Sequence, residues 1–244
     1  MRLTNAFLVI VDISGYTSFI NNRTVSLLHA EQIITELMES VIDRTAHPLI
    51  VNKLEGDAAL LYREWTPGDL AAAHDVFAQV KAFFPAFYAC LGRQRDARAH
   101  CNCDACTRID HLALKAFVHV GELAIKQVRQ FEELAGEEVI LLHRLLKNHV
   151  PSREYVLLTE AARVAADLAV ESLQSHREEL EGIGEASLWL IAPAAIPFEL
   201  PERPADPPHA DVPRREPVFH HLPAAAAEPP PTLLRRLQHW LRGA

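Results

Sequence analysis

The hydrophobic pattern near the start of the chain predicts a strand that ends in an acid. Residues 7–11 (Phe-Leu-Val-Ile-Val) form an unbroken apolar run that stops at Asp12. A short run of this kind is typical of a strand buried on both faces. Residues 14–15 (Ser-Gly) then predict a turn, and Thr17 predicts the N-cap of a following helix. Backbone N–H groups in such a turn can bind phosphate, and a carboxylate beside them can hold a divalent cation.

A β-hairpin with a second acid at its tip is predicted over residues 49–62. Residues 49–54 and 58–62 are strand-like, and Glu-Gly-Asp at 55–57 separates them. If this hairpin lies beside the first strand, Asp12 and Asp57 can hold the same cations. The alternative is that Asp12 only caps the next helix and that Asp57 only fills the turn.

The remaining periodicity predicts an α+β fold. We expect helices over 25–42, from 66–69 to about Leu91, over 139–146 and over 160–173, and strands over 112–120, 122–125 (as a hairpin partner), 155–159 and 187–191. The order β-α-β-β-α-β with extra strands at the end is the ferredoxin-like pattern. The sequence therefore predicts one sheet with helices packed on it.

Composition limits the cellular setting and the partners. The chain has 244 residues, of which 49% are hydrophobic, so one sizeable core is expected. Its net charge is −8, which does not favour nucleic-acid binding. No apolar run approaches the ~20 residues of a membrane span. The apolar strand begins so near Met1 that a signal peptide has no room. We expect a cytoplasmic protein without membrane association.

The C-terminal part of the sequence differs from the domain expected at 1–192. Twelve of the sixteen prolines lie between 193 and 231, which predicts a proline-rich linker. Residues 232–244 predict a short basic amphipathic helix with Leu233, Leu237 and Trp240 on one face. This helix could dock on the domain itself or on a protein partner, and an anionic membrane is the alternative.

Three of the four cysteines are crowded into a polar Cys/His-rich insertion at 93–110. Cys-x-Cys-x-x-Cys places three soft ligands in one tight loop, which indicates a zinc site. The candidate ligands are Cys101, Cys103 and Cys106, with His100, His111 or Cys90 completing a tetrahedron. A redox-active thiol cluster and incidental free thiols are the alternatives.

Four segments in the same order resemble landmarks of class III adenylate and guanylate cyclase catalytic domains. They are Asp-Ile-Ser-Gly-Tyr-Thr at 12–17, Lys-Leu-Glu-Gly-Asp-Ala at 53–58, Phe-Val-His-Val-Gly-Glu-Leu at 117–123, and Gly-Glu-Glu-Val at 136–139 running on to Arg144. The chain also resembles an uncharacterised set of bacterial cyclase-like proteins with a Cys-x-Cys-x-x-Cys insertion. The resemblance implies a ferredoxin-like nucleotidyl cyclase sheet, a homodimer with its sites across the interface, and a role in signalling.

The resemblance also implies a role for individual residues. Two divalent ions, Mg²⁺ or Mn²⁺, would be held by Asp12, Ile13 and Asp57. The triphosphate would lie on Ser14, Gly15, Tyr16 and Thr17. Lys53 and Glu133 would read the base and favour ATP, and Arg144 would support the transition state. The alternative for Lys53 and Glu133 is an ordinary solvated surface.

Two positions depart from the cyclase pattern and leave two functions open. Ile140 stands where the family has a ribose-orienting Asn, and Ile183 stands near its triphosphate-binding Lys. Losing one preorganised donor typically lowers the rate by about 10²–10³. The sequence therefore leaves two classes open. One is a slow adenylate-cyclase-like enzyme, and the other is a catalytically degenerate nucleotide-binding or sensing module that regulates a partner.

Overall fold

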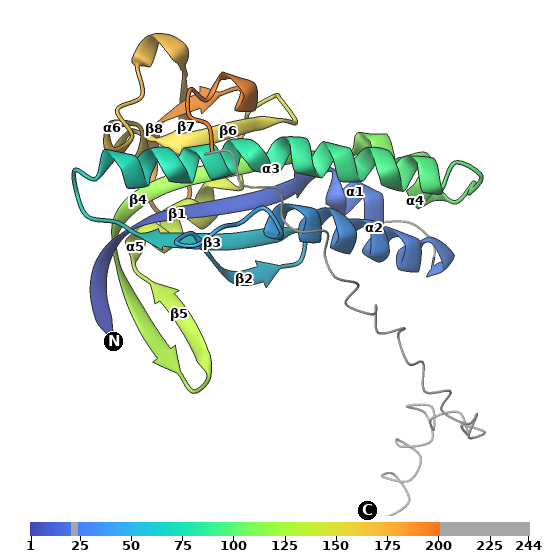
Figure 1. Ribbon diagram of the computed structural model, residues 1–244, viewed down its shortest axis with the longest axis horizontal. Helices are drawn as coiled ribbons and strands as arrows, with labels where there is room; N and C mark the ends of the chain where they lie inside the picture. The colour runs from blue at the N-terminus through green and yellow to red at the C-terminus, as the bar shows by residue number, and fades with distance from the viewer. Residues whose placement is uncertain (21–23, 201–244) are drawn as a thin grey trace, which may run out of the picture. The chain divides into compact units, whose positions relative to one another are not determined.

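The computed structural model describes residues 1–20 and 24–200 (Figure 1). The predicted helix at 232–244 and most of the predicted linker lie outside these residues. The strands are β1 (Arg2–Ser14), β2 (Ile50–Glu55), β3 (Ala58–Glu64), β4 (Ala113–Val128), β5 (Phe131–Ala135), β6 (Tyr155–Thr159), β7 (Gln174–Leu180) and β8 (Gly184–Ile191). The helices are α1 (Tyr16–Ile20), α2 (Thr24–Ile42), α3 (Leu70–Ala97), α4 (Asp104–Thr107), α5 (Glu137–Leu145) and α6 (Glu160–Ala165).

The eight strands of the described residues belong to one sheet. The strand order is β2-β3-β1-β4-β6-β8-β7, and β5 pairs with β4 outside this path. β1 lies near the centre and runs antiparallel to both β3 and β4, whereas β4 and β6 are parallel. The predicted α+β fold, with helices packed on a sheet, is confirmed.

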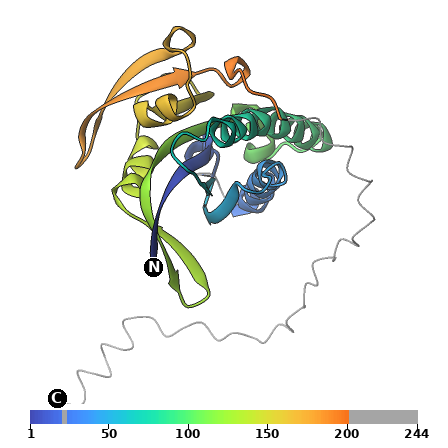
Figure 2. The same cartoon turned by 60° about the vertical axis from the view of Figure 1, so that its left-hand side comes forward.

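The sheet is buried on both faces along β1, as its unbroken apolar run predicts. Val9 and Val11 belong to a core that includes α2 and α3, and Leu8 and Ile10 belong to a second core that includes α5. Successive side chains of a strand point to opposite faces, so a strand between two helical layers has no polar side. Figure 2 shows α2 and α3 on one side of the sheet and α5 on the other.

Several predicted boundaries differ from the structure, including the helix expected to end near Leu91, which continues to Ala97. Residues 122–125 are not a separate hairpin partner, because β1 extends back to Arg2 and pairs with β4 as far as Ile125. The helix from residue 160 ends at Ala165, shortly before Asp167 takes a left-handed φ of 49°. Thr17 is not an N-cap, since α1 already begins at Tyr16.

The packed part of the chain continues beyond residue 192. Ile196 is buried, and Phe198 stacks on the His74 ring with a centroid separation of 3.9 Å. The Lys81 ammonium donates to the Ile196 carbonyl at 2.9 Å. Residues 193–200 therefore cover part of α3 instead of forming the start of a linker.

Among the described residues, the helices are all too short or too polar to cross a bilayer.

Candidate functional site

The structure brings the two predicted metal-binding acids to the same place. Asp12 lies in β1 and is paired with Ala58, the first residue of β3. Asp57 occupies the turn just before Ala58, and its carbonyl accepts a hydrogen bond from the Ile13 N–H at 3.0 Å. The tip of the β2–β3 hairpin is therefore fastened to the carboxyl end of β1.

The pairing register also fixes the face of the sheet on which Asp12 lies. Directly paired residues of neighbouring strands project from the same face. Asp12 is paired with Ala58, which is paired in turn with Glu55. Ala58 belongs to the core that includes α5. Asp12 and Glu55 therefore lie on the α5 side of the sheet, away from α2 and α3.

The two carboxylates influence each other electrostatically. Burial, together with the negative charge of Asp12, raises the pKa of Asp57 from 3.8 to about 6. Burial and the charges of Glu31 and Asp57 raise the pKa of Tyr16. A bound cation would stabilise the charged form of Asp57, which burial and the neighbouring carboxylate disfavour.

Lys115 neutralises part of the negative charge in this corner. The sequence analysis did not identify this residue. It lies opposite Asp12 in the β1–β4 pairing, and its Nζ is 2.8 Å from Asp12 Oδ2, with both side chains 16% exposed. The same ammonium lies 5.9 Å from the centre of the Phe117 ring. A single charged residue within the apolar strand 112–120 was the available signal for it.

The donors in this corner suit a hard divalent cation. Asp12 and Asp57 offer carboxylate oxygens, which are the ligands that Mg²⁺ and Mn²⁺ prefer. The N–H of Ile13 is already bonded to Asp57, so Ile13 could contribute only its carbonyl oxygen. Lys115 occupies one oxygen of Asp12 and supplies one positive charge. The corner therefore fits one cation readily, and a second would share Asp12 with the ammonium.

The turn after β1 depends on glycine. Gly15 has a φ of +93°, and a Cβ there would lie 2.9 Å from the His111 carbonyl oxygen. The Gly15 carbonyl accepts the Phe19 N–H at 3.0 Å. The Tyr16 hydroxyl donates to Glu31 Oε1 of α2 at 3.3 Å. This turn is thus fixed between α2 and the segment that precedes β4.

The predicted base-reading residues lie on two adjacent elements. Lys53 belongs to β2, and its Nζ is 3.1 Å from Glu55 Oε1. Glu133 belongs to β5. The neighbouring Asn52 side chain donates to the Glu132 carbonyl at 3.2 Å, which joins β2 to the β5 hairpin. The structure therefore brings the two elements together, while Lys53 itself is engaged by Glu55.

Glu55 connects β2 to α5. Its Oε2 lies 3.0 Å from His143 Nε2, and His143 Nδ1 is 2.7 Å from the Val139 carbonyl oxygen. Burial raises the pKa of Glu55, but Lys53 and His143 outweigh burial and hold it below its usual value. A chain of contacts thus runs from Lys53 to the residue next to Arg144.

A contact between buried His119 and partly exposed Glu138 positions α5 on the sheet. His119 Nε2 lies 2.6 Å from Glu138 Oε2, and His119 Nδ1 lies 2.8 Å from Thr159 Oγ1. Gly121 makes room for this contact, because a Cβ there would lie 2.7 Å from the Glu138 side chain. Burial lowers the pKa of His119, although Glu138 opposes the shift. The His-x-Gly-Glu stretch therefore has a packing role here.

The two positions that depart from the cyclase pattern line one pocket. Ile140 on α5 and Ile183 in the β7–β8 turn both contribute to a pocket of about 420 Å³, together with Glu137, Glu138, Leu141 and Gly182. They are 57% and 45% exposed. Arg144 lies nearby on α5, and its Nη1 is 2.6 Å from Glu181 Oε2 in the same turn. Such an exposed ion pair is weak, so the guanidinium can exchange it for another anion.

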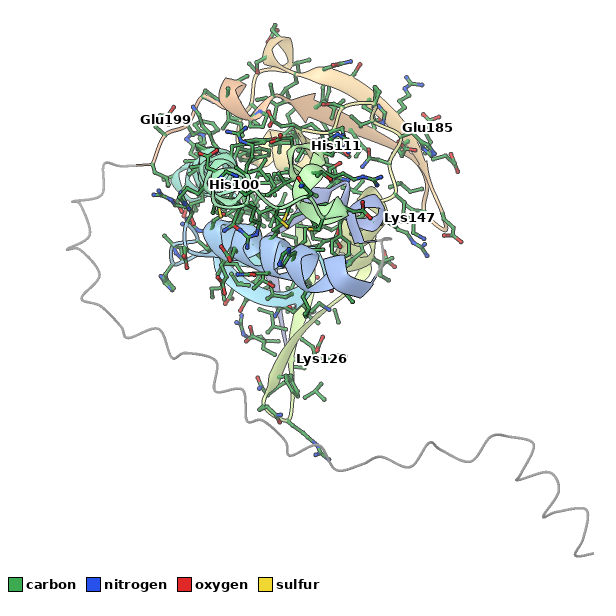
Figure 3. All side chains as sticks on the ribbon, turned by 90° about the vertical axis from the view of Figure 1, so that its right-hand side faces the viewer. His100, His111, Lys126, Lys147, Glu185 and Glu199 are labelled. Carbon is green, nitrogen blue, oxygen red and sulfur yellow. The ribbon has the colours of Figure 1, made fainter. Side chains whose placement is uncertain are left out.

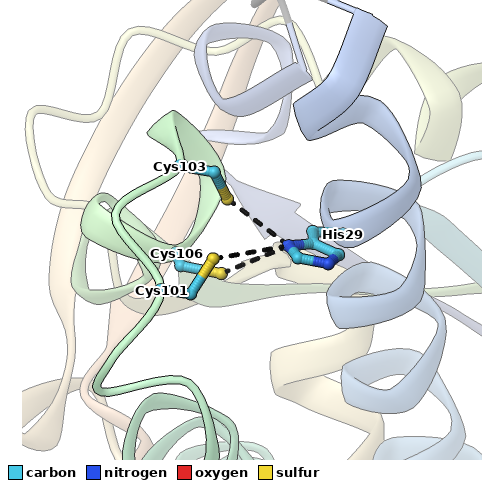
Figure 4. A group of neighbouring side chains, drawn as sticks. All are labelled: His29, Cys101, Cys103 and Cys106. Atoms are coloured by element: carbon cyan, nitrogen blue, oxygen red, sulfur yellow. Dashed lines mark hydrogen bonds between the residues drawn. The ribbon is translucent and has the colours of Figure 1, made fainter.

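The cysteine cluster has a fourth member that the sequence analysis missed. Cys101, Cys103 and Cys106 surround Nδ1 of His29, which lies on α2 (Figure 4). The three earlier candidates for the fourth ligand are elsewhere. His100 and His111 are exposed outside the cluster (Figure 3), and Cys90 is buried in the core with its thiol directed at the Glu36 carbonyl. No local spacing connects His29 to the cysteines, because the helix packing alone brings them together.

Two sequence comparisons find relatives of this chain. The family described as "Protein of unknown function (DUF2652)" matches residues 34–155. An uncharacterized protein of Mycobacterium tuberculosis is 36% identical over 174 residues, which cover 67% of this chain and 78% of that protein.

Two solved cyclase structures are also similar. The guanylyl cyclase Cya2 has a TM-score of 0.58 at 13% identity, covering 78% of this chain and 92% of that one. The adenylyl cyclase CyaB from P. aeruginosa has a TM-score of 0.54 at 13% identity, covering 78% of this chain and 95% of that one. At such identities the likeness shows the fold alone. The chain therefore belongs to the DUF2652 family and has the fold of a class III nucleotidyl cyclase catalytic domain.

Proposed function

We propose that this protein binds a nucleoside triphosphate, with ATP favoured, together with divalent cations at the corner formed by Asp12 and Asp57. The observation that carries the proposal is the convergence of these two acids at the end of β1, on the α5 side of a cyclase-type sheet. Similar structures include adenylyl and guanylyl cyclases. The donor set suits Mg²⁺ or Mn²⁺, as argued above.

The chain's own residues divide the work of binding. Lys115 holds Asp12 in place and reduces the repulsion between the acids. The backbone of the turn over 14–17 faces the phosphates, and Lys53 with Glu133 selects the base. Arg144 exchanges Glu181 for phosphate charge. A bound divalent cation would neutralise the triphosphate beside Asp12 and Asp57.

We further propose a homodimer as the binding unit. The β4–β5 hairpin projects from the body of the domain (Figure 1). It carries Val128 and Phe131, which are 50% and 60% exposed. Large exposed apolar side chains on a projecting hairpin are expected to contact a partner, and a second copy of the chain would place its Lys53 and Arg144 against the Asp12 corner.

A specific observation favours binding without rapid turnover. Ile140 and Ile183 line the same pocket with exposed apolar side chains, where the cyclase resemblance implies hydrogen-bond donors. The second candidate function is therefore a degenerate nucleotide-binding or sensing module for signalling in the cytoplasm. Cyclic nucleotide formation remains the alternative outcome at this site.

Calorimetry with the full chain tests the binding proposal. ATP should bind in the presence of Mg²⁺ or Mn²⁺ and not in chelator, and Asp12→Asn or Asp57→Asn should each weaken binding at least tenfold. Asp43→Asn is the matched control, since Asp43 is exposed just after α2. Absence of metal-dependent binding to a folded dimer would overturn the proposal.

Incubation with Mn²⁺ and each nucleoside triphosphate separates the two candidate functions. Cyclic product that depends on Asp57 would favour the enzyme, and binding without product would favour the sensing module. Preference for ATP over GTP that is lost in Lys53→Ala would support the assigned base-reading role.

A further inference from the structure

Three sulfur atoms converge on a single nitrogen in this fold. His29 Nδ1 lies 3.7 Å from Cys101 Sγ, 3.5 Å from Cys103 Sγ and 3.7 Å from Cys106 Sγ (Figure 4). All four atoms lie within 4.8 Å of one another. The cysteines come from the segment between α3 and β4, while the histidine comes from α2, about seventy residues earlier.

Hydrogen bonding does not account for this arrangement. An imidazole Nδ1 carries either one proton or one lone pair, so it can form one good hydrogen bond and cannot form three. Nothing in such bonding would place the three sulfurs at nearly equal distances. A common atom at the centre of the four ligands would do so.

The distances match the edges of a zinc tetrahedron. With Zn–S near 2.3 Å and Zn–N near 2.05 Å, a tetrahedral site has S···N edges of about 3.6 Å and S···S edges of about 3.8 Å. The observed S···N distances are 3.5–3.7 Å. Thiolate and imidazole together are the ligand set of structural zinc. We propose that Cys101, Cys103, Cys106 and His29 hold one Zn²⁺ in a closed, four-coordinate site.

The local backbone holds the cysteine side chains close enough to bind one metal ion. Cys103 is the N-cap residue of α4, and Cys106 follows three residues later on the same face of that helix. The Cys101 N–H donates to the Arg98 carbonyl at 2.8 Å, and the Thr107 N–H donates to the Cys103 carbonyl at 3.1 Å. These bonds fold residues 98–107 into a compact loop whose sulfurs face α2.

The proposed zinc has a structural role, since all four positions are filled by protein. In the segment 98–111 only Ala105 and Ile109 are buried hydrophobic residues, which is little core for an ordered segment. A metal held from α2 would replace the missing core. It would fasten α2 to the segment whose His111 carbonyl packs against Gly15.

Metal analysis of the full chain, purified without chelator, tests the proposal. Wild type should contain about one equivalent of zinc, and His29→Ala and Cys103→Ser should each fall below about half. His100→Ala and Cys90→Ala are matched controls that should retain the metal, because both residues lie outside the cluster. The cobalt-substituted wild type should show the strong visible bands of tetrahedral cobalt with thiolate ligands.

The wild-type measurements decide the question even if a variant fails to fold. Chelation should make three thiols reactive that were protected before, and zinc should protect them again. Less than half an equivalent of zinc with all cluster thiols freely titrating would overturn the proposal. Iron in place of zinc, or a cobalt spectrum without tetrahedral bands, would also overturn it.

Discussion

Lys115 lies directly opposite Asp12 across the β1–β4 pairing, and its ammonium is 2.8 Å from one oxygen of that carboxylate. Asp57 approaches the same corner from the hairpin tip, and its pKa is raised because it is half-buried near a second acid. The single ammonium of Lys115 thus lies near two carboxylates. The excess of negative charge predicts how this corner should respond to mutation, metal and pH.

Replacing Lys115 should make the fold depend on divalent metal. Lys115→Met leaves Asp12 without its partner in a nearly buried position, and we expect a loss of about 2 kcal/mol in the free energy of unfolding at neutral pH. Mn²⁺ should restore most of this loss. Denaturant titrations with Mn²⁺ and with chelator would measure it, and Lys126→Met is the control because Lys126 is exposed on the same strand (Figure 3). Equal losses with and without metal would contradict the claim that Lys115 and the cation stabilise the same two acids.

Replacing Asp57 should stabilise the metal-free protein while removing metal-dependent binding. The folded-state pKa of about 6 lies above the usual 3.8, so this carboxyl favours folding below about pH 3.8, and that contribution is lost as pH rises through about 6. Asp57→Asn should therefore gain about 1 kcal/mol at pH 7, after allowance for solvent screening. The gain should shrink as pH falls toward 4. A stability–pH series against Asp43→Asn would show whether it does.

The metal affinity of the corner should fall in acid for the same reason. Below about pH 6 a proton occupies Asp57 and competes with the cation. Mn²⁺-dependent ATP binding should therefore weaken by about tenfold for each pH unit below 6, because one proton is displaced. Calorimetry in matched buffers between pH 5 and pH 8 measures this dependence. A flat profile would exclude Asp57 as a ligand.

Restoring polar groups in the pocket between α5 and the β7–β8 turn should raise any cyclase activity. Ile140→Asn should increase the rate, with an upper limit of about 10²–10³ per restored donor. Because Ile140 and Ile183 line the same pocket, Ile140→Asn with Ile183→Lys should exceed the product of the single effects. Val164→Asn is the control, since Val164 is a similarly exposed apolar residue on α6. Product assays with Mn²⁺ and ATP would follow the rates, and a decrease in the double variant would count against the assignment.

Removing zinc should lower the melting temperature. If the proposed site contributes about 3 kcal/mol, chelation should reduce Tm by roughly 6–12 °C for a domain of this size. His29→Ala should start from the lower value and show no further response to chelator, whereas His100→Ala should behave as wild type. Differential scanning calorimetry compares the three proteins. An unchanged Tm in wild type would show that the cluster does not support the fold.

The sequence by itself determined the elements whose signals are local. The apolar run at 7–11 predicts a strand buried on both faces, and Glu-Gly-Asp at 55–57 predicts the hairpin, because side-chain alternation and turn geometry act over a few residues. Their order was enough to predict the α+β fold. The length of β4 escaped prediction because pairing with β1 decides it. The end of the helix at Ala165 escaped prediction because a left-handed residue, Asp167, follows it.

Only the tertiary structure decided which polar side chains share a site. Lys115 meets Asp12 through strand register, and His29 meets the three cysteines through the packing of α2 against α4. Ile140 and Ile183 meet through the contact of α5 with the β7–β8 turn. These partners are separated by tens of residues, and no local spacing encodes them. Electrostatic and metal sites depend on distances of a few ångströms, which the folded chain alone sets.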